Sequence, residues 1–90
     1  MARYIAQSTH TPEECLQALD TFLAHGEGTL AGWDFGCAAG DHSNHTAYAV
    51  LEAANESSAR SQVPSSLQAA TNLAEVGKFT PAQIRSFHAG

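Results

Sequence analysis

Basic residues are scarce in this sequence: four lysines and arginines stand against nine aspartates and glutamates, and the formal net charge is −5. The four are spread along the chain and form no cluster: Arg3, Arg60, Lys78 and Arg85. Proteins that follow a nucleic-acid backbone gather lysine and arginine side chains on one surface. We therefore expect no nucleic-acid partner.

Long apolar runs are also missing, and none approaches the ~18 residues that a membrane-crossing helix needs. The opening Met-Ala-Arg-Tyr-Ile enters β-prone sequence at once and has no signal-peptide core. The sequence therefore predicts a cytoplasmic protein without a membrane partner. Cys15 and Cys37, the two cysteines present, are then expected to be reduced thiols and not a disulfide framework.

Charged residues of all kinds make up only 14% of the chain, against about 25% in an average protein. A single domain over residues 1–90 is expected to bury roughly 60–65% of its unfolded surface, which leaves little stability in reserve. A sparsely charged surface on a small domain favours pairing with a second subunit. We expect a homodimer.

Helix-start signals are the clearest local patterns. Residues 11–14, Thr-Pro-Glu-Glu, form a capping box with proline at the first helical position. Apolar residues, beginning with Cys15, then recur at helical spacing to about His25, which predicts one apolar helix face. Asn55 is suited to cap a second helix. Residues 80–83, Thr-Pro-Ala-Gln, repeat the first pattern and start a short helix in a C-terminal tail at 79–90.

Four β-prone stretches alternate with these helices, at residues 3–8, 29–37, 45–53 and 70–79. The order β-α-β-β-α-β predicts an α+β fold of ferredoxin-like type, an antiparallel sheet with both helices on one face. We expect the strand order 4-1-3-2, with the first and third strands as parallel neighbours. Trp33 and Phe35 are expected on the open face, where two sheets would pack together as a dimeric α+β barrel.

The whole layout resembles a known superfamily. A first strand of the Ala-Arg-Tyr-Ile kind, a Thr-Pro-x-Glu helix, a glycine-containing hairpin and a closing Phe-Thr-Pro-x-Gln segment are similar to those of small bacterial proteins of the dimeric α+β barrel superfamily. Muconolactone-isomerase-like, YciI-like and GYD-domain proteins share this layout. The resemblance implies the fold and the homodimer, and it carries no catalytic residue over to this chain.

The connection between the second and third strands, residues 36–48, is rich in metal-capable side chains. Imidazole, thiolate and carboxylate groups suit zinc or iron. The tail helix, with an apolar edge at Ile84 and Phe87, is expected to dock at the same end of its own sheet or on the same region of the partner subunit. The candidate metal ligands are Cys37, Asp41, His42, His45 and His88. The alternative interpretation is an ordinary turn closed by Asp41, with solvated histidines.

His10 is the alternative location for chemistry. It lies where the first strand meets the capped helix, near polarised N–H groups, and a histidine there can act as an acid or base. The parallel pairing assumed above puts it at the opposite end of the sheet from residues 36–48. The candidate catalytic residues are His10, Asp34, His42 and His45, and the candidate ligand-binding residues are Trp33, Phe35 and Tyr48.

Three functions remain open. The first is a small isomerase, cyclase or monooxygenase that acts on an apolar molecule, for which no cofactor is expected. The second is a non-catalytic module that binds a small molecule or a metal, zinc or iron, through residues 36–48. The third is a purely structural dimer. Standard metal-site spacings are missing, and so is a recognisable pair of activated catalytic groups, so the sequence does not choose among them.

Overall fold

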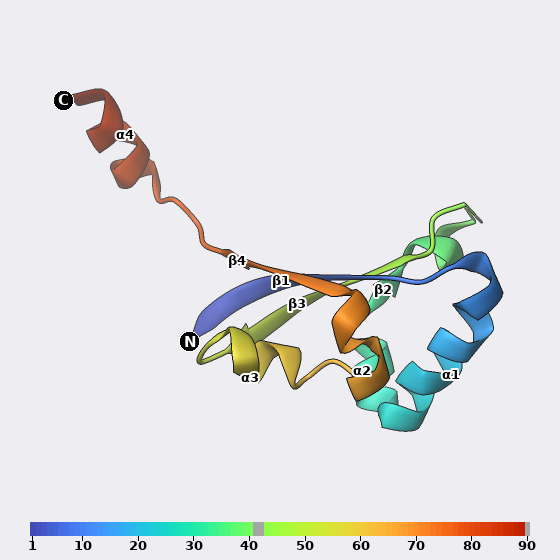
Figure 1. Cartoon of the computed structure of the whole chain (residues 1–90). Helices are drawn as coiled ribbons and strands as arrows, with labels where there is room; N and C mark the ends of the chain where they lie inside the picture. Colours follow the sequence, from blue (N-terminus) through green and yellow to red (C-terminus); the bar gives the residue numbers. More distant parts are fainter. Residues whose placement is uncertain (41–42, 90) are drawn as a thin grey trace.

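The computed structural model describes residues 1–40 and 43–89 (Figure 1). Its α-helices, β-strands and 3-10 helices (η) follow in the order β1 (Ala2–Thr9), η1 (Pro12–Glu14), α1 (Cys15–His25), α2 (Glu27–Ala31), β2 (Asp34–Phe35), η2 (Gly36–Ala39), β3 (Thr46–Ala53), α3 (Glu56–Arg60), η3 (Ser65–Ala70), β4 (Thr71–Val76) and α4 (Pro81–Ala89). A four-stranded antiparallel sheet with short helices confirms the α+β class.

The strands form one sheet in the order β2-β3-β1-β4, and every neighbouring pair is antiparallel. Thr9 at the end of β1 lies opposite Thr46 at the start of β3. The prediction that the first and third strands are parallel is wrong. A helical crossover brings the chain from β1 to β2 in the same direction, and the β2–β3 connection then reverses it. As a result, His10 and His45 lie at the same end of the sheet.

Most of the predicted second strand, residues 29–37, is not in the sheet. Only Asp34 and Phe35 pair with β3, between the short helices α2 and η2. Gly26, with φ of 139°, ends α1, and its carbonyl accepts the N–H of Leu30 at 3.0 Å. A second helix therefore starts directly after the first, where the sequence pattern predicted a strand.

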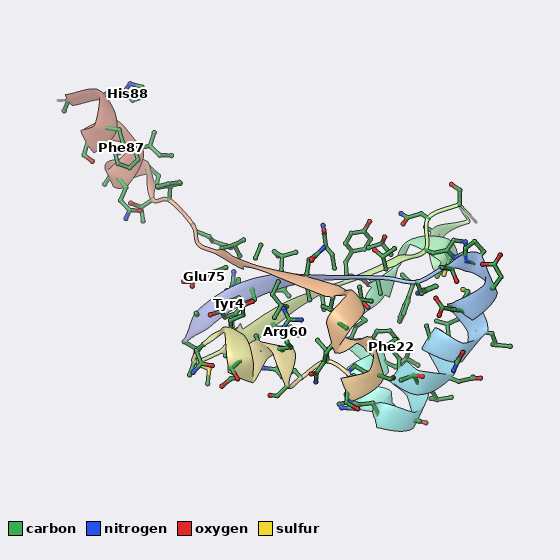
Figure 2. All side chains as sticks on the ribbon, in the orientation of Figure 1. Tyr4, Phe22, Arg60, Glu75, Phe87 and His88 are labelled. Carbon is green, nitrogen blue, oxygen red and sulfur yellow. The ribbon has the colours of Figure 1, made fainter. Side chains whose placement is uncertain are left out.

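The hydrophobic core lies between the helices and one face of the sheet. Figure 2 shows Phe22 of α1 on this helical side. Its ring centroid is 5.0 Å from that of Trp33 and 5.2 Å from that of Phe35. Trp33 is only 5% exposed, so the prediction that Trp33 and Phe35 face the open side is wrong. The other buried members of this cluster are Ala6, Ala47, Ala49, Leu51 and Val63.

The opposite face of the sheet is open. Figure 1 shows α1, α2 and α3 together on one side of the strands. The alternation of burial along β1 and β3 puts Ile5, Tyr48 and Val50 on the other side. Val50 is 57% exposed. This open face, defined by these three residues, is therefore apolar at its centre.

Arg60 joins the end of α3 to the last strand. Its Nη1 donates to the carbonyl oxygens of Gln68 at 2.7 Å and Thr71 at 3.0 Å. Figure 2 shows its side chain between α3 and the sheet, beside Tyr4. Asn55 caps α3 as predicted, because its Oδ1 accepts the N–H of Ser58 at 2.8 Å. These bonds fix the path from β3 to β4.

The C-terminal arm, residues 77–89, extends away from the rest of the chain (Figure 1). The predicted cap of α4 is present, since Gln83 N–H donates to Thr80 Oγ1 at 3.1 Å. No residue of α4 is buried. β4 runs antiparallel to β1 and ends opposite Arg3, so the arm leaves from the end of the sheet remote from His10. The prediction that the tail docks at residues 36–48 of its own chain is wrong for this reason, and docking on the same region of a partner subunit stays a prediction.

Candidate metal centre

Four metal-capable side chains converge at the end of the sheet where β1 stops and β3 starts. They are His10, Cys15, Cys37 and His45, here called the Cys2His2 cluster. One ligand atom from each residue lies within 4.8 Å of all the others, and all four residues are half-buried. The four come from separate segments: the loop after β1, the start of α1, η2 and the residue before β3. The fold, not a local motif, therefore assembles the cluster.

The β1–β3 ladder positions the two histidines. His10 N–H donates to the carbonyl oxygen of His45 at 3.1 Å, which continues the strand pairing by one residue. The ring centroids are 5.5 Å apart and the rings meet edge to face. Just before β3, Asn44 Oδ1 accepts the N–H of Thr46 at 3.1 Å. The antiparallel register therefore holds both imidazoles side by side.

Helix-start chemistry positions the first cysteine. Thr11 N–H donates to Glu14 Oε1 at 3.3 Å, and Thr11 Oγ1 donates to the same atom at 2.9 Å. The start of the helical segment is thereby fixed, and Cys15 is the first residue of α1. Its Sγ lies 3.9 Å from the Sγ of Cys37.

Close packing positions the second cysteine. Gly36 opens η2, and a Cβ atom on it would collide with the side-chain amide of Asn44. Only glycine permits this approach between η2 and the loop that leads into β3. Cys37 is the next residue, so its place depends on that contact.

Burial favours the uncharged forms of His10 and Cys15 when no metal is bound. Burial lowers the pKa of His10 below 6.5, the nearby His45 lowers it further, and Glu14 acts in the opposite direction. Burial raises the pKa of the Cys15 thiol, and its hydrogen bond and proximity to Cys37 raise it further. A neutral imidazole is the form that binds metal, whereas a thiol must lose its proton. Metal binding is therefore expected to release protons from the cysteines.

Two ring nitrogens of the cluster have no hydrogen-bond partner within residues 1–40 and 43–89. They are His10 Nε2 and His45 Nδ1, and both are buried. Buried polar atoms are nearly always paired, and an unpaired one costs roughly 1–3 kcal/mol. A bound ion would satisfy both nitrogens at once.

The sulfur separation fits tetrahedral zinc. Zn–S bonds of about 2.3 Å in a tetrahedron place two sulfurs about 3.8 Å apart. The observed separation of Cys15 and Cys37 is 3.9 Å. Two cysteines and two histidines are also a recurrent zinc-ligand set. The arrangement can therefore hold a four-coordinate metal with little movement.

The predicted metal set is only partly brought together. Cys37 and His45 are in the cluster, and His88 is on the remote arm (Figure 2). Asp41 and His42 lie outside the described residues. His10 was expected at the opposite end of the sheet and joins the cluster because β1 and β3 are antiparallel.

Sequence reasoning missed Cys15. Its spacing from the next apolar residues of α1 suggested a place on the apolar helix face. The signal that could have found it is its position at the first turn of the helix that follows His10. Once that end of β1 is paired with the start of β3, the first turn of α1 lies beside Cys37 and His45.

The other predicted site residues are dispersed. Asp34 is exposed on β2 and pairs with Tyr48, away from the histidine pair. Trp33 and Phe35 pack in and against the core, while Tyr48 lies on the open face. That face has a hollow of about 300 Å³, lined by Ile5, Gly32, Asp34, Tyr48, Ala49 and Val50. Of the three predicted ligand-binding aromatics, only Tyr48 lines it.

A smaller hollow of about 170 Å³ borders the Cys2His2 cluster. His10 belongs to both, and Glu14 and Gln17 of the following segment also line the hollow. The remaining lining residues are Thr9, Ala18, Thr21, Ser66, Leu67 and Ala70. A small polar molecule in this space would meet His10 directly.

Two further findings bear on the class of protein. None of the helices in residues 1–40 and 43–89 has the length and apolar character needed to cross a bilayer. The chain was also compared with models of protein families, with curated proteins and with solved structures. None of these three comparisons gave a match.

Proposed function

We propose that this chain binds one transition-metal ion, zinc in the first instance, through the Cys2His2 cluster. The observation that carries this proposal is the convergence of four ligand atoms to within 4.8 Å from four separate segments. The two unpaired buried nitrogens and the tetrahedral sulfur separation support it. Zinc with four protein ligands is a structural site, because no coordination position is left for a substrate.

The metal would stabilise an end of the sheet whose linking residues lie outside the hydrophobic clusters. None of the four ligands belongs to a buried hydrophobic cluster, and β2 beside them has only two residues. A metal here links the end of β1, the start of α1, η2 and the start of β3. A ligand that binds only the folded state stabilises it by mass action, by about 4 kcal/mol at 1,000 times its dissociation constant.

Metal content of the purified full chain tests the proposal. We expect one zinc ion per chain by elemental analysis, and a tetrahedral thiolate spectrum after substitution with Co²⁺. Single variants Cys15→Ser, Cys37→Ser, His10→Ala and His45→Ala should each lose the metal. Because His42 belongs to the sequence-predicted set, His42→Ala is measured beside them.

His25→Ala is the matched control. His25 is the last residue of α1, at the opposite end of that helix from Cys15, and it bonds to Thr29 Oγ1 at 3.0 Å, so its loss should leave the metal in place. Metal content well below one per chain, or content that the four ligand variants do not change, would contradict the proposal.

We propose in addition the finer architecture that the sequence suggested: a ferredoxin-like sheet that pairs with a second copy through its open face. The strand order β2-β3-β1-β4 and the helices on one side support it. Ile5, Tyr48 and Val50 supply the apolar surface that Trp33 and Phe35 do not.

Two free cysteines suit the cytoplasm, where thiols stay reduced.

A small-molecule site beside the metal is the second candidate function. The hollow of about 170 Å³ that shares His10 with the cluster favours it. If His10 left the metal to act as an acid or base there, the Co²⁺ spectrum would respond to added small anions. A spectrum that ignores them would restrict the site to the structural role.

A further inference from the structure

We infer that Cys15 and Cys37 form a redox pair: a peroxide oxidises them to a disulfide, and the bound metal is expelled. The inference rests on the proposed metal function for the expulsion, although the thiol pair itself is a feature of the structure. It makes the Cys2His2 cluster a site that oxidation empties and reduction restores.

The geometry favours a bond between these two sulfurs. They lie 3.9 Å apart, and a disulfide needs about 2.05 Å. The two sulfurs must therefore approach by the difference between 3.9 Å and about 2.05 Å, which is about 1.9 Å. The chain has no third cysteine, so no other thiol of the same molecule competes for either sulfur.

The required movement falls on an element that can shift. η2, which holds Cys37, has no buried residues and is followed by Gly40, whose φ is 92°. α1, which holds Cys15, is anchored in the core by Phe22. We therefore expect η2 to approach α1. Both cysteines are half-buried, which leaves access for a molecule as small as hydrogen peroxide.

The reaction balances in both states. In the metal-bound form, the two thiolates give up two electrons and form the S–S bond, and hydrogen peroxide takes these two electrons and two protons from the solvent to become two waters. The metal loses two of its four ligands and leaves as a divalent cation. In the metal-free form, the two thiol protons complete the waters. A dithiol reductant reverses the step: it reduces the disulfide between Cys15 and Cys37 to two thiols and is itself oxidised to a disulfide.

The test uses the zinc-loaded full chain and hydrogen peroxide. Zinc release is followed with a chromophoric chelator, and the mass of the intact chain is measured in parallel. We expect release of one zinc per chain together with a loss of two hydrogen atoms in the monomeric chain. Dithiothreitol followed by zinc should restore the loaded form. His25→Ala is the control and should behave as the wild type.

The serine variants isolate the thiol pair. Cys15→Ser and Cys37→Ser each leave one thiol, so neither should lose two hydrogens within one chain. A chain that binds zinc but releases it only after overoxidation, or through disulfides between chains, overturns the inference and leaves the proposed function standing. A chain that never binds zinc overturns the proposed function, whatever its thiols do.

Discussion

At the scale of single residues, His10 shows how the sheet direction creates a site. Its backbone extends the β1–β3 ladder, and its ring is consequently held against His45. Burial and this second ring lower its pKa below 6.5, which keeps a lone pair on the imidazole near neutral pH. The same pKa makes the stability of the metal-free fold depend on pH.

Acidification should destabilise the metal-free chain between about pH 6.5 and the lower folded pKa of His10. On acidification the unfolded state takes up the proton first, so stability is complete above 6.5 and is lost as the pH falls through the folded pKa. His10→Gln should flatten this dependence, and His88→Gln on the exposed arm should not. Urea unfolding at several pH values measures it. An unfolding free energy that stays level down to pH 5 would contradict the prediction.

Gly36 offers a matched pair of substitutions. Gly36→Ala should lower metal affinity and cost roughly 1–3 kcal/mol of stability, because its Cβ would collide with Asn44 and displace Cys37. Gly28→Ala is the control, since a Cβ there meets nothing within 4 Å and α2 should gain about 0.5–1 kcal/mol. Metal titration and thermal melting distinguish the two. Equal behaviour of both variants would show that the Asn44 contact is unimportant.

At the scale of elements, the sequence predicts best what is settled within a few residues. The caps at Thr11, Asn55 and Thr80 are correct because each bonds to a group three residues away. The strand predicted at 29–37 fails because α2 depends on the turn at Gly26 and on burial of Trp33 against Phe22. Alternating apolar residues cannot report a tertiary contact of that kind.

The same distinction applies to the candidate site: two of its residues could be predicted from local sequence, and the other two depend on the fold. Cys37 and His45 could be found because the connection between two strands is rich in metal-capable residues. His10 and Cys15 depend on which end of the sheet β1 and β3 share, and that follows from strand direction, not from spacing. Had the first and third strands been predicted as antiparallel, the sequence alone would have placed His10 at the same end of the sheet as the connection between the second and third strands.

Trp33 belongs to the core, and this gives a prediction for the α2–β2 connection. Trp33→Ala should cost roughly 3–5 kcal/mol of unfolding free energy, because the indole is 5% exposed and packs on Phe22. Trp33→Asp should unfold the chain, because it puts an unpaired charge at this buried position. Leu16→Ala, on α1 and at 70% exposure, is the control and should change stability by less than about 0.5 kcal/mol. Chemical denaturation compares them.

At the scale of the whole molecule, the open sheet face is the surface we expect to pair. Val50→Glu should shift a dimer toward monomer, because a charge would be buried opposite the apolar residues of a second copy. Leu16→Glu is the control: Leu16 is 70% exposed on α1, on the other side of the sheet. Sedimentation at micromolar concentration measures both. A wild-type chain that sediments only as a 9.5 kDa monomer would end this expectation.

The C-terminal arm has a consequence for protease access. Trypsin cleaves after lysine and arginine, and of the four such residues Lys78 and Arg85 lie on the arm. Arg3 and Arg60 lie in β1 and α3, bound to Glu52 and to the path into β4. Brief digestion should therefore remove residues 79–90 first and leave a fragment 1–78 with an unchanged melting temperature and metal content, since α4 buries no residue. Early cleavage after Arg60 would instead mean that the body opens before its arm is lost, and that the arm is held by a contact outside the single chain.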